Sequence, residues 1–185
     1  MTRYVAFLRS INTPPRHVKM ARLQTVFNGL GFENVATFIA SGNVIFDTDD
    51  PFDLVLRIEA ALEADLGFEV PVFLRTGAET IAVAECQPFP DHLGELEVSF
   101  LASEPSRAAA RALEVTASGA DLLAVIGREV FWAHTGPHGD STHSEARVMR
   151  TLGMPTTRRS LRTVRGIARA HLNWQPATPT SGDPR

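Results

Sequence analysis

The sequence predicts an α+β protein in which two βαββαβ halves follow one another along the chain. Apolar runs of strand length alternate with segments whose apolar residues recur at the spacing of one helix face. Two hairpins are indicated, around Gly42-Asn43 and around Gly127-Arg128, and their glycines lie 85 residues apart. The glycines that end the following helices, Gly67 and Gly153, lie 86 residues apart. Two ferredoxin-like units, with mainly antiparallel sheets and covering helices, account for this repeat.

The first half is punctuated by proline and glycine. Pro14-Pro15 predicts a loop, because proline lacks the backbone donor that helices and sheets use. Asp50 is expected to cap a helix with Pro51 at its first position, and Gly67 is expected to end it. In order, we expect a strand at 4–11, a helix at 20–30, hairpin strands within 37–46, a helix at 51–66, a strand at 70–74 and a helix at 76–86.

The second half repeats this order after a proline-rich stretch. We expect a strand at 97–102, a helix at 105–117, hairpin strands at 122–126 and 129–135, a helix at 142–152, a short segment around Thr156 and a last helix ending near Leu172. The helix at 142–152 is expected to begin with the capping box Thr142-x-x-Glu145. The predicted organisation is an N-terminal half at 1–86, a linker at 87–94, a C-terminal half at 95–172 and a disordered tail at 173–185.

Composition restricts the function classes. The 185 residues include 18 basic and 21 acidic side chains, an ordinary balance for a globular protein. Cys86 is the single cysteine, which excludes an intramolecular disulfide and a multi-cysteine zinc site. The chain shows no signal-peptide pattern and no apolar run of about 18 residues, so we expect a cytoplasmic protein without membrane contact. No phosphate-binding or dinucleotide-binding glycine motif is present, and we expect no cofactor.

Charge is segregated along the chain. Residues 1–22 carry a net charge of +5, residues 23–142 carry −14 and residues 143–172 carry +6. On the last predicted helix, the 3.6-residue period places Arg162, Arg165 and Arg169 on one face. Such a row suits phosphate or carboxylate, because the planar guanidinium forms paired hydrogen bonds with them. The alternative is a solvated face whose arginines pair with the acidic middle segment.

These observations favour a binding module whose two basic ends converge on an anionic ligand, namely a nucleotide, a nucleic acid or a small acid. No aromatic residues are interleaved with the arginines, which weakens the single-stranded nucleic-acid interpretation. A monomer or weak homodimer is expected. The predicted ligand-binding residues are Arg9, Asn12, Lys19, Ser41, Asn43, Ser141, Arg159 and Arg162.

Two other functions stay open. An enzyme could use the loop Asp140-Ser141-His143, in which His134 and His138 provide further metal-type ligands. The metal signal is weak, because the same spacing is typical of surface histidines beside a helix cap, and no G-x-S-x-G elbow supports a serine hydrolase. Catalytic residues and a metal site are therefore left unassigned. The third function is a structural or protein-interaction domain that uses a sheet edge or the acidic segment.

Several motifs together resemble the N-terminal signature of the bacterial domain of unknown function 1697 family. They are Tyr4-Val5-Ala6-Phe7-Leu8-Arg9-Ser10-Ile11-Asn12, Val18-Lys19-Met20, Leu30-Gly31-Phe32-Glu33-Asn34-Val35, Ser41-Gly42-Asn43-Val44-Ile45-Phe46, Phe68-Glu69-Val70-Pro71-Val72 and Gln87-Pro88-Phe89-Pro90. The resemblance covers nearly the whole chain except the tail, and it implies no established activity.

The chain departs from this family at three places. The family usually has a Gly-Gly loop where this chain has Pro14-Pro15, and Ser-Lys where this chain has Ser141-Thr142. Its Arg-Asn-Trp motif resembles Arg159-Ser160-Leu161, in which only the arginine is kept. All three changes fall on the loops and element ends predicted to form a site, so a function shared by the family is expected to be altered here.

Overall fold

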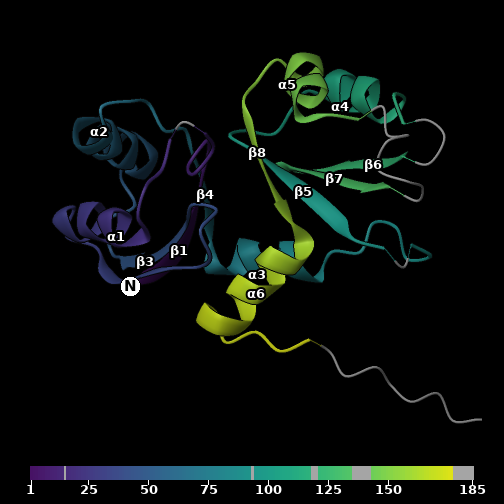
Figure 1. The fold of residues 1–185 in the computed structure, drawn as a ribbon. Helices are drawn as coiled ribbons and strands as arrows, with labels where there is room; N and C mark the ends of the chain where they lie inside the picture. The colour runs from purple at the N-terminus through teal and green to yellow at the C-terminus, as the bar shows by residue number, and fades with distance from the viewer. Residues whose placement is uncertain (15, 93, 118–120, 135–142, 177–185) are drawn as a thin grey trace, which may run out of the picture.

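The computed structural model describes residues 1–14, 16–92, 94–117, 121–134 and 143–176 (Figure 1). The first half contains, in order, β1 (Thr2–Leu8), α1 (Met20–Gly29), β2 (Glu33–Thr37), β3 (Asn43–Thr48), α2 (Leu54–Leu66), β4 (Val72–Thr76) and α3 (Gly77–Glu85). The second half contains β5 (Leu96–Leu101), α4 (Arg107–Glu114), β6 (Asp121–Ile126), β7 (Glu129–His134), α5 (Glu145–Leu152), β8 (Thr156–Ser160) and α6 (Leu161–His171).

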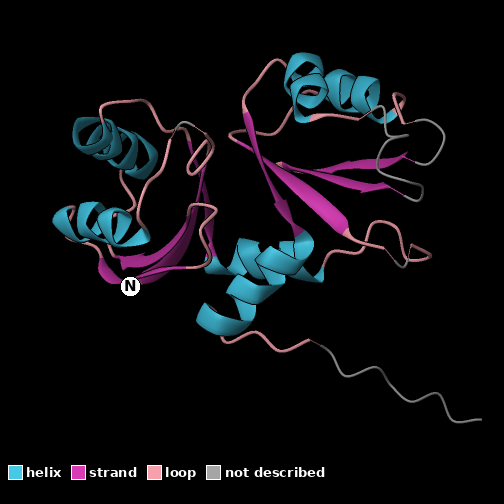
Figure 2. Cartoon of the chain, viewed as in Figure 1, coloured by secondary structure: helices cyan, strands magenta, loops and turns pink. Residues whose placement is uncertain are grey.

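Each half forms one four-stranded antiparallel sheet, and the two sheets have the same topology (Figure 2). The strand orders are β2-β3-β1-β4 and β6-β7-β5-β8, with every pairing antiparallel. The predicted α+β fold of two βαββαβ halves is therefore confirmed. Each half also ends in a helix, α3 or α6, and these two helices lie together where the halves meet (Figure 1).

The strand registers define which residues are equivalent in the two halves. Leu8 faces Val72 across β1 and β4, and Leu101 faces Thr156 across β5 and β8. Three residues further along each fourth strand, the two registers place Arg75 and Arg159 at equivalent positions. The repeat is thus one of backbone geometry, which conserves few side chains but does conserve this buried arginine.

Among the described residues, three apolar clusters hold the fold together. One lies under α1 and α2 and includes Phe27 and Ile58, and another lies under α4 and α5 and includes Leu113. The third cluster takes residues from both halves, and at its centre the rings of Phe7 and Phe100 stack with centroids 3.9 Å apart. The two halves therefore share a core, which fixes how one sheet sits against the other.

The first hairpin differs from its prediction. β3 begins at Asn43 itself, and the connection from β2 spans residues 38–42. The prediction of a two-residue turn at Gly42-Asn43 is therefore wrong. Gly42 has a φ of +76°, as its position in this longer turn requires, and its carbonyl accepts a 2.8 Å hydrogen bond from Leu8 N. The second hairpin does turn at Gly127-Arg128, as predicted.

Helix starts were the least accurate predictions, because short polar side chains also bond to nearby loop backbone. α2 begins after Asp53 rather than Asp50, whose carboxylate instead accepts a 3.1 Å bond from Phe52 N and pairs with Arg57 at 2.6 Å. α5 is capped by Ser144, so the capping box starting at Thr142 is wrong. The expected stops at Gly67 and Gly153 are confirmed, since both have left-handed backbones at their helix ends.

The chain stays packed beyond α6. Trp174 falls within the predicted tail, yet it is 7% exposed and its indole donates a 2.9 Å hydrogen bond to Glu85 on α3. Residues 177–185 of that predicted tail lie outside the described residues. No helix of the described chain has the length and apolar character needed to cross a membrane.

Candidate functional site

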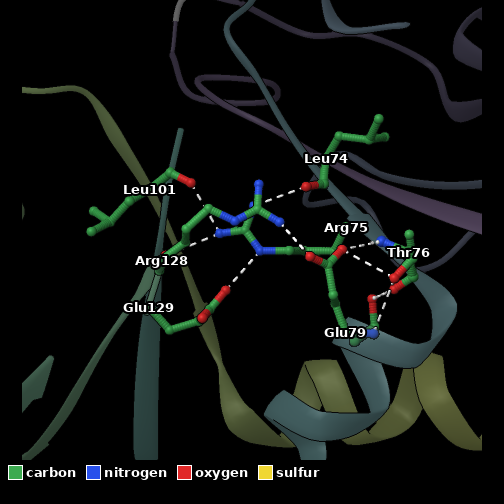
Figure 3. Close-up of polar contacts among 8 residues, drawn as sticks. Leu74, Arg75, Thr76, Glu79, Leu101, Arg128 and Glu129 are labelled. Atoms are coloured by element: carbon green, nitrogen blue, oxygen red, sulfur yellow. Dashed lines mark hydrogen bonds and ion pairs between the residues drawn. The ribbon is translucent and has the colours of Figure 1, made fainter. Parts of the chain in front are cut away.

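Arg75 is 1% exposed. Its side chain joins the first half to the second (Figure 3). Its Nε donates to a carboxylate oxygen of Glu129 at 2.7 Å, and its Nη2 donates to the carbonyls of Leu101 and Arg128 at 2.9 and 3.0 Å. Burial lowers the pKa of Arg75, while the neighbouring Glu129 carboxylate raises it. Arg75 is therefore a buried cation that is neutralised by a carboxylate of the opposite half.

Arg159 makes the reciprocal contact from the second half to the first. Its Nη2 donates to the carbonyls of Leu8 and Gly42 at 2.8 and 3.3 Å, the residues equivalent to Leu101 and Arg128. Its Nε donates to Asn43 Oδ1 at 2.7 Å. The remaining Nη1 donates to the Arg158 carbonyl and the Thr157 hydroxyl, so all of its nitrogens are engaged.

The two arginines differ in what neutralises them. Asn43 faces Phe7 across β1 and β3, and Glu129 faces Phe100 at the equivalent place across β5 and β7. Arg159 thus meets an amide where Arg75 meets a carboxylate. Burial lowers the pKa of Arg159 to about 10, with Glu145 raising it, so the guanidinium stays protonated at neutral pH. Arg159 is 8% exposed, and within the described chain no carboxylate bonds to it.

A cavity of about 700 Å³ opens above Arg159, and we call it the junction cavity. It is lined by residues 8–13 after β1, residues 39–41 between β2 and β3, Glu145 at the start of α5, and residues 156–159 of β8. Three of its non-glycine residues, Ser10, Asn12 and Ile39, have left-handed φ values of 57°, 59° and 50°. A left-handed backbone is rare for a β-branched residue such as Ile39. Backbone strain of this kind concentrates at functional sites.

The junction cavity carries excess positive charge. Its lining contains Arg9, Arg158 and Arg159 against Glu145, which leaves two net positive charges. Arg158 pairs with Glu97 at 2.9 Å and with Glu145 at 3.5 Å. In the described part of the chain, the Arg9 guanidinium makes no hydrogen bond or ion pair. Arg9 is therefore the lining cation whose donors are free to bind a ligand. The buried Arg159 adds positive charge to the same cavity, although its donors are already used.

The equivalent cavity around Arg75 is smaller and has no unpaired arginine among its described lining residues. The cavity there has only about 300 Å³. Its arginines Arg75 and Arg128 are paired with Glu129 at 2.7 Å and with Glu79 at 2.6 Å (Figure 3). The two halves thus present one small, neutralised pocket and one larger, cationic pocket at equivalent positions. Shared fold geometry alone does not produce that difference.

The structure brings together half of the predicted ligand-binding residues. Those that line the junction cavity are Arg9, Asn12, Ser41 and Arg159. Asn43 lies buried beside them and donates to the Ser41 hydroxyl at 2.9 Å. Lys19 is exposed at the start of α1, Arg162 lines a different cavity, and Ser141 lies outside the described residues. Glu145, Thr157 and Arg158 were missed, although Arg158 belongs to the basic segment that the sequence had revealed.

The predicted histidine loop is only partly described. His138, Asp140 and Ser141 lie outside the described residues. His134 and Asp121 form a pair across β6 and β7, with His134 Nδ1 and Asp121 Oδ1 2.9 Å apart. Asp121 had no signal in the sequence, because it meets His134 only through the hairpin register. Among the described residues, no group of three or more His, Cys, Asp or Glu side chains could hold a metal ion.

The burial of His143 predicts that stability depends on pH. Its ring stacks on Trp132 at 5.0 Å, and burial, followed by the charge of Arg158, lowers its pKa from 6.5 to about 4, with Arg147 lowering and Asp121 raising it. As pH falls below 6.5, the unfolded chain binds this proton before the folded chain does, so stability is lost towards pH 4. After a discount for solvent screening, we expect a loss of about 1 kcal/mol between about pH 7 and pH 5.

Urea denaturation at both pH values measures this loss. His143→Phe keeps an aromatic ring on Trp132 and is expected to flatten the dependence, leaving the smaller contribution of His171, whose pKa burial also lowers. An equal loss of stability in the variant and the parent would assign the dependence to other groups.

Three comparisons place the chain among known proteins. A family model described as "Protein of unknown function (DUF1697)" matches residues 1–131. The structure of a conserved bacterial protein, SP0830 from Streptococcus pneumoniae, is similar with a TM-score of 0.71 and 24% sequence identity. The similarity covers 91% of this chain and 97% of that chain, and at this identity it shows the fold alone. No curated protein matches the chain.

Proposed function

The chain belongs to the DUF1697 family, and on that premise we propose that it is a binding module that takes a small anionic ligand in the junction cavity. The observation that carries the proposal is the buried Arg159 cation, which meets Asn43 where its counterpart Arg75 meets a carboxylate. An anion in the cavity would provide the missing negative charge. Uncompensated buried charge is costly, so neutralising it contributes favourably to binding.

Arg9 is the direct contact in this proposal. All nitrogens of Arg159 already donate to protein acceptors, whereas the Arg9 guanidinium is available at the cavity wall. A free guanidinium forms two parallel hydrogen bonds with a carboxylate or a phosphate. The hydroxyls of Ser10 and Ser41 line the same cavity and add neutral donors, whereas the Thr13 hydroxyl donates to the Ser10 carbonyl. Arg9 therefore sets the ligand's position, and Arg159 sets its preferred charge.

The size and lining favour a small ligand over a nucleic acid. The junction cavity, at about 700 Å³, falls within the range of small-molecule pockets. Among its described lining residues there is no aromatic side chain on which a base could stack. A compact phosphate or carboxylate compound fits these features best.

Arg9→Gln tests the proposal, because the Arg9 side chain makes no polar contact with the described residues, and its backbone bond to the Pro71 carbonyl is kept in the variant. We expect its unliganded stability to stay within about 0.5 kcal/mol of the parent. Pyrophosphate or citrate at about a hundred times its Kd is expected to stabilise the parent by about 2.7 kcal/mol. The variant is expected to bind at least about tenfold more weakly, since a hydrogen bond to a charged group contributes about 1.5–3 kcal/mol. Thermal unfolding and calorimetric titration measure the two quantities.

Arg162→Gln is the matched control, since it removes the same charge from a different cavity. Potassium chloride at equal ionic strength controls for general screening. The proposal fails if no phosphate or carboxylate compound stabilises the parent beyond the salt control, or if both variants lose the effect equally.

A further inference from the structure

A second cavity of about 770 Å³ runs along one face of α6, and we call it the α6 cavity. One wall carries Arg162, Arg165 and Arg169, the row of arginines that the helix period had indicated. Phe38, Ile39 and Leu96 make apolar walls. Of the described residues that line the two cavities, Ile39 is common to both, so the α6 cavity has its own set of charged groups.

The apolar wall is held in place by a close approach between the halves. Phe38 belongs to the turn between β2 and β3, yet its ring lies on α6 at Gly166. A Cβ atom at residue 166 would come within 2.6 Å of Phe38 Cζ, so any other residue there would require the Phe38 ring to move. The ring of Phe38 also meets the ring of His171 edge-on at 6.0 Å. The first half thus closes one side of a cavity whose charged side belongs to the second.

The charged wall retains binding capacity. Arg162 pairs with Glu95 at 2.6 Å, but these side chains are 83% and 66% exposed, and such exposed pairs are weak. Arg165 uses its Nε for the carbonyl of Ala84 at 2.9 Å, while Arg169 lies over the Trp174 ring. Three arginines against Glu95 leave two net positive charges in the lining.

His92 adds an unexplained polar atom at this cavity. Its Nε2 is buried and makes no hydrogen bond with any described residue. The ring rests against Gly94, where a Cβ atom would lie 2.6 Å from Nε2. A buried polar group without a partner costs about 1–3 kcal/mol, so this nitrogen favours a partner such as a water molecule or a ligand in the cavity.

From these contacts we infer that the α6 cavity is a second binding site, for an organic anion with a carboxylate or phosphate head and an apolar body. The head lies against the arginine wall and within reach of His92, and the body lies against Phe38 and Ile39. The inference does not depend on the proposed function of the junction cavity, because different arginines carry it.

Calorimetric titrations of the full chain with four small probes can separate the contributions of the anionic head and the apolar body to binding. Phenyl phosphate and phenylacetate have both parts, benzyl alcohol has only the body, and inorganic phosphate has only the head. We expect one or both of the first two to bind at least tenfold more tightly than the last two at this cavity. The stronger of the two identifies the head group. Equal binding of benzyl alcohol would overturn the charged part of the inference.

Two variants give a crossed control. Arg162→Gln/Arg169→Gln is expected to weaken the favoured phenyl probe at least tenfold and to leave pyrophosphate or citrate binding unchanged. Arg9→Gln is expected to do the reverse. If Arg9→Gln removes the phenyl probe instead, the α6 cavity is not a separate site. If it removes neither ligand, the junction-cavity proposal fails while this one stands.

His92→Phe tests the buried nitrogen. The variant removes an unpaired polar atom, so we expect it to unfold at a higher urea concentration than the parent and to bind the phenyl probe at least fivefold more weakly. Unchanged probe affinity would remove His92 from the site.

Discussion

Replacing Arg75 by methionine is expected to destabilise the protein by about 4 kcal/mol, because it leaves the largely buried Glu129 carboxylate without its ion-pair partner. Glu129 is 14% exposed and would lose its ion pair, and the carbonyls of Leu101 and Arg128 would lose a donor. The same guanidinium lies over the Phe100 ring at 5.3 Å, at the centre of the core that both halves share. Urea denaturation measures the free energy of unfolding.

Two further variants isolate the ion pair from the packing. Arg128→Gln removes a neighbouring, more exposed arginine whose pair with Glu79 is expected to contribute less than about 1 kcal/mol. Arg75→Met/Glu129→Leu removes both charges, and we expect it to recover most of the loss, since an apolar pair of similar volume can replace a buried ion pair. A single-variant loss below about 1 kcal/mol, no larger than the surface-pair control, would contradict this role of Arg75.

Replacing Gly42 by alanine is expected to cost about 3 kcal/mol, of which only part is backbone strain. Its φ of +76° disfavours any L residue, and an added Cβ would lie 3.0 Å from Ile11 Cβ and 3.2 Å from Leu8 Cβ. Those two Cβ atoms are bonded directly to the backbone, so they cannot move away without a shift of the main chain. The carbonyl of Gly42 also accepts bonds from Leu8 N and from Arg159, so a shift here disturbs the contact between the halves.

Gly67→Ala is the matched control for the strain. Gly67 has nearly the same φ, +78°, but nothing lies within 4 Å of an added Cβ. We therefore expect it to lose about 1 kcal/mol. The difference between the two variants measures packing at the junction. Equal losses would show that the fold relaxes around residue 42 and that this close approach contributes little.

The two clusters that carry the proposals depend on the same contact between halves. Arg159 lines the junction cavity and donates to the Gly42 carbonyl, and the turn that follows β2 carries Phe38 onto α6. Arg9 and Arg162 stand outside these packed contacts. Variants of the first group therefore test stability, whereas variants of the second group test binding, and the two kinds of result can be read separately.

Local pattern determined much of the fold. Apolar periodicity and turn residues are short-range signals, so they placed the helices, most of the strands, the stops at Gly67 and Gly153, and the turn at Gly127-Arg128. They misplaced β2, which spans Glu33–Thr37 and so lies almost entirely before the 37–46 range expected for the hairpin strands. They failed at the start of α2, which follows Asp53, while the Asp50 carboxylate bonds to the loop backbone at Phe52 N. The predicted equivalence of Gly42 and Gly127 also shifted by one residue, because register places Gly42 level with Arg128.

By itself, the sequence determined the α+β order of elements, the repeat, the family resemblance and the concentration of arginines near both ends of the chain. Only the tertiary structure decided which arginines are available. Arg159 was expected to contact a ligand, but it is buried against Leu8 and Asn43, more than a hundred residues away. Arg9 and Arg162, expected in one site, line two cavities. Periodicity shows which face a side chain occupies, whereas strand register and the docking of the two sheets decide what that face meets.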